Sequence, residues 1–201
     1  MGTPAFQLFL ITSLACLCSC AGNRNLQGKL IEPEFNPNVC SSSLGNNQLH
    51  WTFHNDASVL DWKHAEGKRK LPKKFQMFAV NKQELQAYLT AANVSGVQSI
   101  IALPISEGIG CRRFEVSPSG TLSPELAKKY PQLISLKGVS AENEQADLRI
   151  DFDGEKMEAQ INWNNQIFYI SSWPAHSGEL YYLVYKKEDS GRTKIPRKPT
   201  K

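Results

Sequence analysis

Cysteine is the residue type in this chain with the clearest chemical potential. Three of the five cysteines stand two residues apart in the stretch LACLCSC, and the other two are Cys40 and Cys111. Thiols can be acylated, joined in disulfides or bound to metals, and their context decides between these uses. The clustered cysteines close an uncharged, mostly apolar run, residues 6–20. This run has the length of the apolar region of a signal peptide and is shorter than a bilayer-spanning helix of about 20 residues.

The end of this run resembles a bacterial lipobox. Leu17 lies three residues before Cys20, and a small residue, Ser19, directly precedes it. In signals of this kind the cysteine accepts a diacylglycerol and becomes the new N-terminus, and two or three acyl chains anchor a protein stably. We therefore expect residues 1–20 to be a lipoprotein signal peptide, Cys20 to carry lipid, and the protein to be a membrane-anchored lipoprotein of the cell envelope. Cleavage as an ordinary secretory signal, giving a secreted protein, is the alternative.

The two remaining cysteines would then lie in an oxidising compartment, where a pair of thiols can form a disulfide. Cys40 and Cys111 are far apart in the sequence. Sequence spacing alone leaves open whether they pair, because a disulfide requires their Cα atoms to approach closely.

The sequence contains no catalytic or metal-binding motif that we recognise. Its four histidines are His50, His54, His64 and His176. None belongs to an HExxH pair, and the first two lie in a strand-like alternation that does not place them on one helical face. Asp151 and Asp153 lie at a strand end or turn, where we expect them to be solvated. We expect no metal site, no cofactor and no enzymatic activity.

The net charge of +4 is unevenly distributed along the chain. Residues 186–201 contain seven Lys or Arg and two Asp or Glu, a net of +5, which leaves −1 for the remainder. A nearly neutral folded part predicts no nucleic-acid partner. We interpret residues 189–201 as a solvated basic tail.

Two short helices are predicted by their capping signals. The helix expected over residues 81–93 begins with Asn81 as a cap and has Glu84 three residues later. A second helix is expected to begin at Ser123-Pro124 and to end before Pro131. Because it has barely two turns, we expect it to depend on the packing of Leu126 and Tyr130.

The rest of the C-terminal part has the pattern of β-strands. Strands are expected over residues 75–80, 97–105, 111–117, 132–139, 146–154, 156–163, 166–173 and 180–188. Short links, including a tight turn at Asn164-Asn165, favour an antiparallel meander. We therefore predict one α+β domain over residues 71–188, with a mostly antiparallel sheet and two short helices. Residues 21–70 are interpreted as a tether and poorly defined segment, within which residues 49–54 are a lone strand or a docking segment.

A series of landmarks runs in order through the predicted domain. They are FAVNKQELQAYLTAA, RFEV, LSPELAKKYPQLISLKG, LRIDF, QIFYIS and YYLVYKKED. The run from Phe75 to Lys187 resembles the propeptide-like domain that precedes reprolysin-type zinc metalloproteases in bacteria, especially those of Bacteroidetes. In the family a catalytic domain with a zinc motif follows the last strand, and here SGRTKIPRKPTK follows instead.

The resemblance implies a non-catalytic domain that binds, shields or assists the folding of a reprolysin-type metalloprotease domain. Shielding by edge pairing of a strand or turn over the protease cleft requires no special residue. Some eukaryotic relatives use a cysteine switch on zinc, and Cys111 is the candidate for that role, although the eukaryotic switch motif is not found here. The alternatives are a cell-envelope adhesion or interaction module, and the product of a truncated metalloprotease gene.

Overall fold

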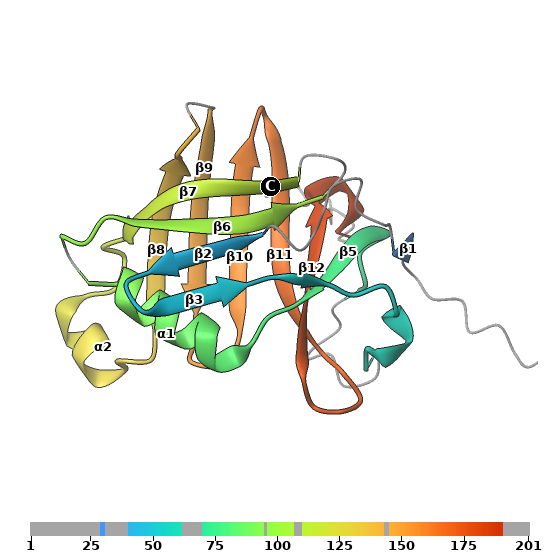
Figure 1. Cartoon of the computed structure of the whole chain (residues 1–201), viewed down its shortest axis with the longest axis horizontal. Coiled ribbons are helices and arrows are strands. Elements are labelled where there is room, and N and C mark those ends of the chain that lie inside the picture. The colour runs from blue at the N-terminus through green and yellow to red at the C-terminus, as the bar shows by residue number, and fades with distance from the viewer. Residues whose placement is uncertain are drawn as a thin grey trace, which may run out of the picture.

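The computed structural model describes residues 29–30, 40–61, 70–94, 96–106, 110–142 and 145–190. A ten-stranded sheet organises this part of the chain, in the order β1-β5-β12-β11-β10-β9-β8-β7-β6, with β4 also paired to β5 (Figure 1). Its strands are β1 (Lys29–Leu30), β4 (Thr52–Phe53), β5 (Lys74–Ala79), β6 (Ser99–Ile105), β7 (Gly110–Pro118), β8 (Ile134–Ser140), β9 (Ala146–Phe152), β10 (Met157–Trp163), β11 (Gln166–Pro174) and β12 (Leu180–Lys186). All pairs are antiparallel except β1 with β5.

The predicted α+β class is confirmed. From β6 to β12 each strand pairs with the next one along the chain, which is the meander that the short links predicted. The turn between β10 and β11 has positive φ values at Asn164 (46°) and Asn165 (63°), as a two-residue hairpin turn requires. β6 continues through Pro104, which is tolerated because β6 is the last strand of the sheet.

The sheet curls around the main hydrophobic core. In Figure 1, β6 and β7 cross in front of β8–β11, and the separate hairpin of β2 (Ser41–Leu44) and β3 (Asn47–His50) extends this front layer. Helix α1 (Lys82–Ala92) lies along the hairpin and buries the apolar stripe Leu85, Tyr88, Leu89 and Ala92. Alternate residues of β8–β12 point into the same core.

Both predicted helices are present, but one is held differently from our expectation. The Asn81 side chain accepts hydrogen bonds from the backbone N–H groups of Gln83 and Glu84, which confirms the cap of α1. Ser123 caps α2 (Pro124–Lys129) in the same way. The expected packing of α2 is wrong, because Leu126 and Tyr130 stay 40% and 38% exposed. The caps and first-position proline, rather than core contacts, define this helix.

The prediction of a tether over residues 21–70 is wrong for residues 40–61, which we call the N-terminal segment. Cys40, Leu49, Trp51 and Leu60 are at most 1% exposed. The Trp51 indole Nε1 donates to the Ala102 carbonyl at 3.1 Å. The folded domain therefore begins no later than Cys40, and the turn-rich composition of this stretch belongs to the β2–β3 hairpin.

Candidate protein-binding face

The outer face of the sheet is divided into two parts by what covers it. On β5, β12 and the end of β11, the outward residues Phe75, Met77, Leu183 and Trp173 are buried in a second hydrophobic cluster. The N-terminal segment supplies the cover through Leu60 and the short 3-10 helix η2 (Ala57–Val59). We call this part the covered half.

The outward residues of the neighbouring strands are polar and accessible. We call this surface the open face, and it consists of Asp147, Arg149, Asp151, Glu158, Gln160, Asn162 and Tyr169. The opposite sides of the same strands carry core residues such as Ile150, Ile161 and Ile170. Strict alternation along β9 and β10 therefore aims every second side chain at this surface.

Strand register fixes the neighbours across the open face. Gln160 lies between Arg149 of β9 and Tyr169 of β11. In the same way, Glu158 lies between Asp151 and Ser171. Cross-strand neighbours of this kind have Cβ atoms about 5 Å apart, so their side chains form continuous rows.

Hydrogen bonds hold several of these side chains in place. Asn162 donates to the Asp147 carboxylate at 3.1 Å, and the Arg149 guanidinium lies 3.4 Å from the Asp151 carboxylate. Ser135 of β8 also donates to Asp151, at 2.7 Å. Polar groups positioned in this way lose less conformational entropy when a partner binds them.

Asp151 and Asp153 are both exposed, as the sequence predicted, and each also has hydrogen-bond partners. Asp151 is exposed but shared between Arg149 and Ser135. Asp153 accepts hydrogen bonds from the backbone N–H groups of Glu155 and Lys156, at 2.8 and 2.7 Å, and so forms the turn between β9 and β10.

A shallow hollow of about 390 Å³ marks the centre of the open face. Arg149, Asp151, Glu158 and Tyr169 contribute to its lining, together with Tyr185. The rings of Tyr169 and Tyr185 are 5.7 Å apart. Tyrosines combine a large apolar ring with a hydroxyl, and this combination is typical of protein interfaces.

A second hollow, of about 710 Å³, lies where the start of α1 meets the turns after β9 and β11. An ion pair between Lys82 and Glu155, 4.0 Å apart, spans it. Burial, reinforced by the carboxylate of Glu158, raises the pKa of Tyr182 above its usual value.

The structure joins Cys40 to Cys111 in a disulfide, with their Cα atoms 5.3 Å apart. It ties the start of the N-terminal segment to the start of β7. A disulfide sulfur is not a thiolate, and only a thiolate ligates zinc, so Cys111 in this form does not fit the cysteine switch. Cys20, the predicted lipidation site, lies outside the described residues.

The described histidines lie in separate environments. His50 is 3.8 Å from Glu84, His176 is 3.9 Å from Asp61, and the ring of His54 packs on Tyr181. His64 lies outside the described residues. Within the ranges that the structure describes, no group of three or more His, Cys, Asp or Glu side chains can hold a metal ion. In the same ranges, no helix has the length and apolar character needed to cross a bilayer.

Sequence reasoning identified the strands of the open face but missed the face itself. The available signal was that the polar positions of residues 146–152 and 157–163 fall on the same side of adjacent antiparallel strands. Comparison with protein-family models, with curated proteins and with solved structures finds no match to this chain.

Proposed function

We propose that this chain is a non-catalytic binding domain whose partner is a reprolysin-type metalloprotease domain, which it shields or helps to fold. The landmarks that resemble the propeptide-like domain run from β5 to β12 in one continuous sheet. The observation that carries the proposal is the open face. It is an ordered, tyrosine-bearing surface on a rigid sheet, whereas its neighbouring half is covered by the chain itself.

Docking through this face is favoured over the edge pairing that we expected from the sequence. The outer edge of β5 is occupied by β1 and β4. The other end of the sheet, β6, meets the β2–β3 hairpin, since the Ala102 N–H donates to the Ser42 hydroxyl at 2.6 Å. Pro104 also removes a backbone donor from this strand. A strand from a partner would therefore have to displace existing contacts.

The face proposed here has the composition of a specific but separable interface. It has both charge signs, two amides and a tyrosine, rather than a wide apolar surface. Interfaces of this polarity form between proteins that are also stable alone. A few aromatic anchors usually supply most of the binding energy, and Tyr169 occupies that position next to the hollow.

The direct test is capture of secreted metalloproteases of the same cell by residues 21–201, which contain every residue that the structure describes. We expect a reprolysin-type catalytic domain to be retained and its peptidase activity to fall on binding. Retention of envelope glycans or matrix components alone would favour the alternative, an adhesion module.

Tyr169→Ala tests the surface within this proposal. We expect the dissociation constant of the protease complex to rise about 30-fold, which corresponds to a hot-spot loss of about 2 kcal/mol. Tyr130→Ala is the matched control, since Tyr130 is an exposed tyrosine on α2, away from the open face. Equal effects of the two substitutions would place the interface elsewhere.

We also propose that Cys20 carries the lipid that holds this domain at the membrane, on the strength of the lipobox-like LCSC sequence. Replacing Cys20 with alanine should move the protein from the membrane fraction to the soluble fraction, and should abolish incorporation of radiolabelled fatty acid. Undiminished labelling of the variant would contradict lipidation at this residue.

A further inference from the structure

Three lysines form a row across three adjacent strands at one end of the sheet. Lys29 of β1 is the register partner of Lys74 of β5. Gln76 of β5 pairs with Val184 of β12, and continuing this antiparallel register by two residues places Lys186 opposite Lys74. The row therefore concentrates positive charge at this end of the sheet.

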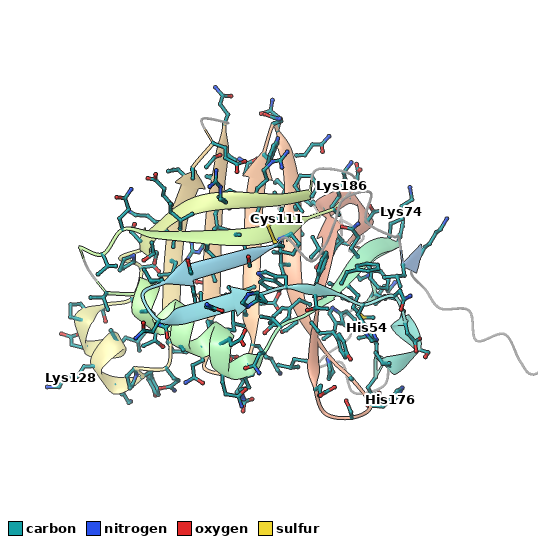
Figure 2. The ribbon with its side chains drawn as sticks, in the orientation of Figure 1. His54, Lys74, Cys111, Lys128, His176 and Lys186 are labelled. Carbon is teal, nitrogen blue, oxygen red and sulfur yellow. A yellow bond between two sulfur atoms is a disulfide. The ribbon has the colours of Figure 1, made fainter. Side chains whose placement is uncertain are left out.

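Backbone contacts bring further lysines to the same end. The Lys29 N–H donates to the Lys73 carbonyl at 2.6 Å, and the Lys73 N–H donates to the Asp189 carbonyl at 2.7 Å. The second contact draws in the short 3-10 helix η3 (Lys187–Asp189). Figure 2 labels Lys74 and Lys186 at this end of the molecule and Lys128 at the opposite end.

We call this region the basic end, and it consists of Lys29, Lys70, Lys73, Lys74, Lys186 and Lys187. The three passages that form it, 29–30, 70–74 and 186–190, contain six lysines and two acids, Glu188 and Asp189, a net of +4. This equals the charge of the whole chain, so everything else sums to zero. Sequence reasoning missed the basic end because its lysines come from three distant passages.

The rest of the described part of the chain has the opposite sign. Outside the basic end, its described residues carry eight Lys or Arg and twelve Asp or Glu, a net of −4. Among the described residues, one end of the domain is thus cationic while the remainder is anionic.

Chain length places the basic end near the proposed anchor. Lys29 lies nine residues after Cys20. A fully extended chain spans at most about 3.6 Å per residue, so β1 is held within about 32 Å of a lipid on Cys20. This step rests on the lipidation proposed above, and no other described strand is as close to Cys20 in the sequence.

We propose that the basic end binds anionic phospholipid headgroups of the membrane that holds the lipid anchor. The acyl chains and the lysines are then two membrane signals on one face of the domain.

The experiment uses residues 20–201 carrying Cys20→Ser, so that no lipid contributes to binding. The probes are phosphatidylcholine vesicles with and without phosphatidylglycerol, and the measurement is co-sedimentation at low and raised salt. We expect binding only to the anionic vesicles, weakened by salt. Each lysine near such a surface contributes about a factor of five to partitioning, so Lys29→Gln/Lys73→Gln/Lys74→Gln should lower it about 100-fold.

The matched control is Lys128→Gln/Lys129→Gln/Lys137→Gln, which removes the same charge from exposed lysines elsewhere. It should change partitioning by less than about threefold, because charges farther than a Debye length of about 10 Å are screened. Equal losses in the two variants, equal binding to neutral vesicles, or complete displacement from the vesicles by equimolar duplex DNA would overturn the proposal. A failure here leaves fatty-acid labelling of Cys20 unaffected, so the two proposals can fail separately.

Discussion

The covered half and the open face belong to the same outer surface of the sheet, but only the first is buried by another part of the chain. Strand β11 passes through both: Trp173 is buried under the N-terminal segment, whereas Tyr169, four residues earlier on the same side, borders the hollow of the open face. The strand geometry is the same in both places. The difference lies in whether another part of the chain is available to cover the side chains.

The residue pattern of each strand reflects whether its outer face is covered or exposed. In β12, LYYLVY is apolar on both sides, since Leu183 packs in the covered half and Val184 packs in the main core. In β10, MEAQINW alternates between core and polar residues. A continuous apolar run in an antiparallel strand therefore indicates that something covers its second face, and strict alternation indicates that this face is left open.

The largest expected effect on the free energy of unfolding comes from removing a buried side chain of the covered half. Trp173→Ala removes a buried indole that packs with Leu60 and Leu183, and should lower the free energy of unfolding by about 3–5 kcal/mol. The measurement is urea unfolding followed by circular dichroism.

The matched substitution on the open face is Gln160→Ala, at an exposed position of β10. It should change the unfolding free energy by less than about 0.5 kcal/mol, since surface substitutions rarely do more. Similar losses at both positions would contradict the distinction between the two surfaces.

The disulfide sharpens the comparison, because it ties down the segment that provides the cover. Replacing Cys40 and Cys111 together with alanine should cost about 2–4 kcal/mol, mainly by freeing the unfolded chain. Hydrogen exchange should accelerate in the N-terminal segment and in β5 more than in β9 and β10. Uniform acceleration over all strands would show that the segment is not a separately held cover.

Local signals predicted the parts of this fold that depend on local interactions. Asn81 and Ser123 cap the expected helices, and the Asn164-Asn165 turn sets the expected register of β10 and β11. The alternation of residues 49–54 was recognised and falls on β3 and β4. The place of the N-terminal segment in the core was missed because its contacts are distant: Trp51 bonds to Ala102, 51 residues later.

The open face could have been predicted from the sequence more easily than the basic end. The alternation of β9 and β10 was visible, so the open face required only the step of pairing two adjacent strands. The basic end required the parallel pairing of Lys29 with Lys74 across 45 residues, which no local pattern specifies. Charge counted along the chain therefore did not show that lysines from three passages gather at one end of the sheet.

The smallest expected effect concerns the cap of the covering segment. The Asp56 carboxylate accepts hydrogen bonds from the Ser58 hydroxyl at 2.6 Å and from the Ser58 N–H at 2.9 Å, at the start of η2. These bonds, the hydroxyl first, lower the pKa of Asp56 below its usual 3.8. Because the folded-state pKa is the lower one, the stabilisation is fully present above pH 3.8 and is lost as the pH falls through the folded-state value. Hydrogen exchange of residues 57–60 should rise over that range.

Asp56→Asn separates this cap from general acid destabilisation. The asparagine keeps an acceptor oxygen but has no charge to titrate, so exchange of residues 57–60 should lose its dependence on pH below 3.8, after correction for the intrinsic exchange rate. Asp147→Asn, on the open face, should leave that dependence in place, because Asp147 bonds to Asn162 and not to the covering segment. A carboxyl carbon resonance of Asp56 that titrates at or above 3.8 would remove the basis for this prediction.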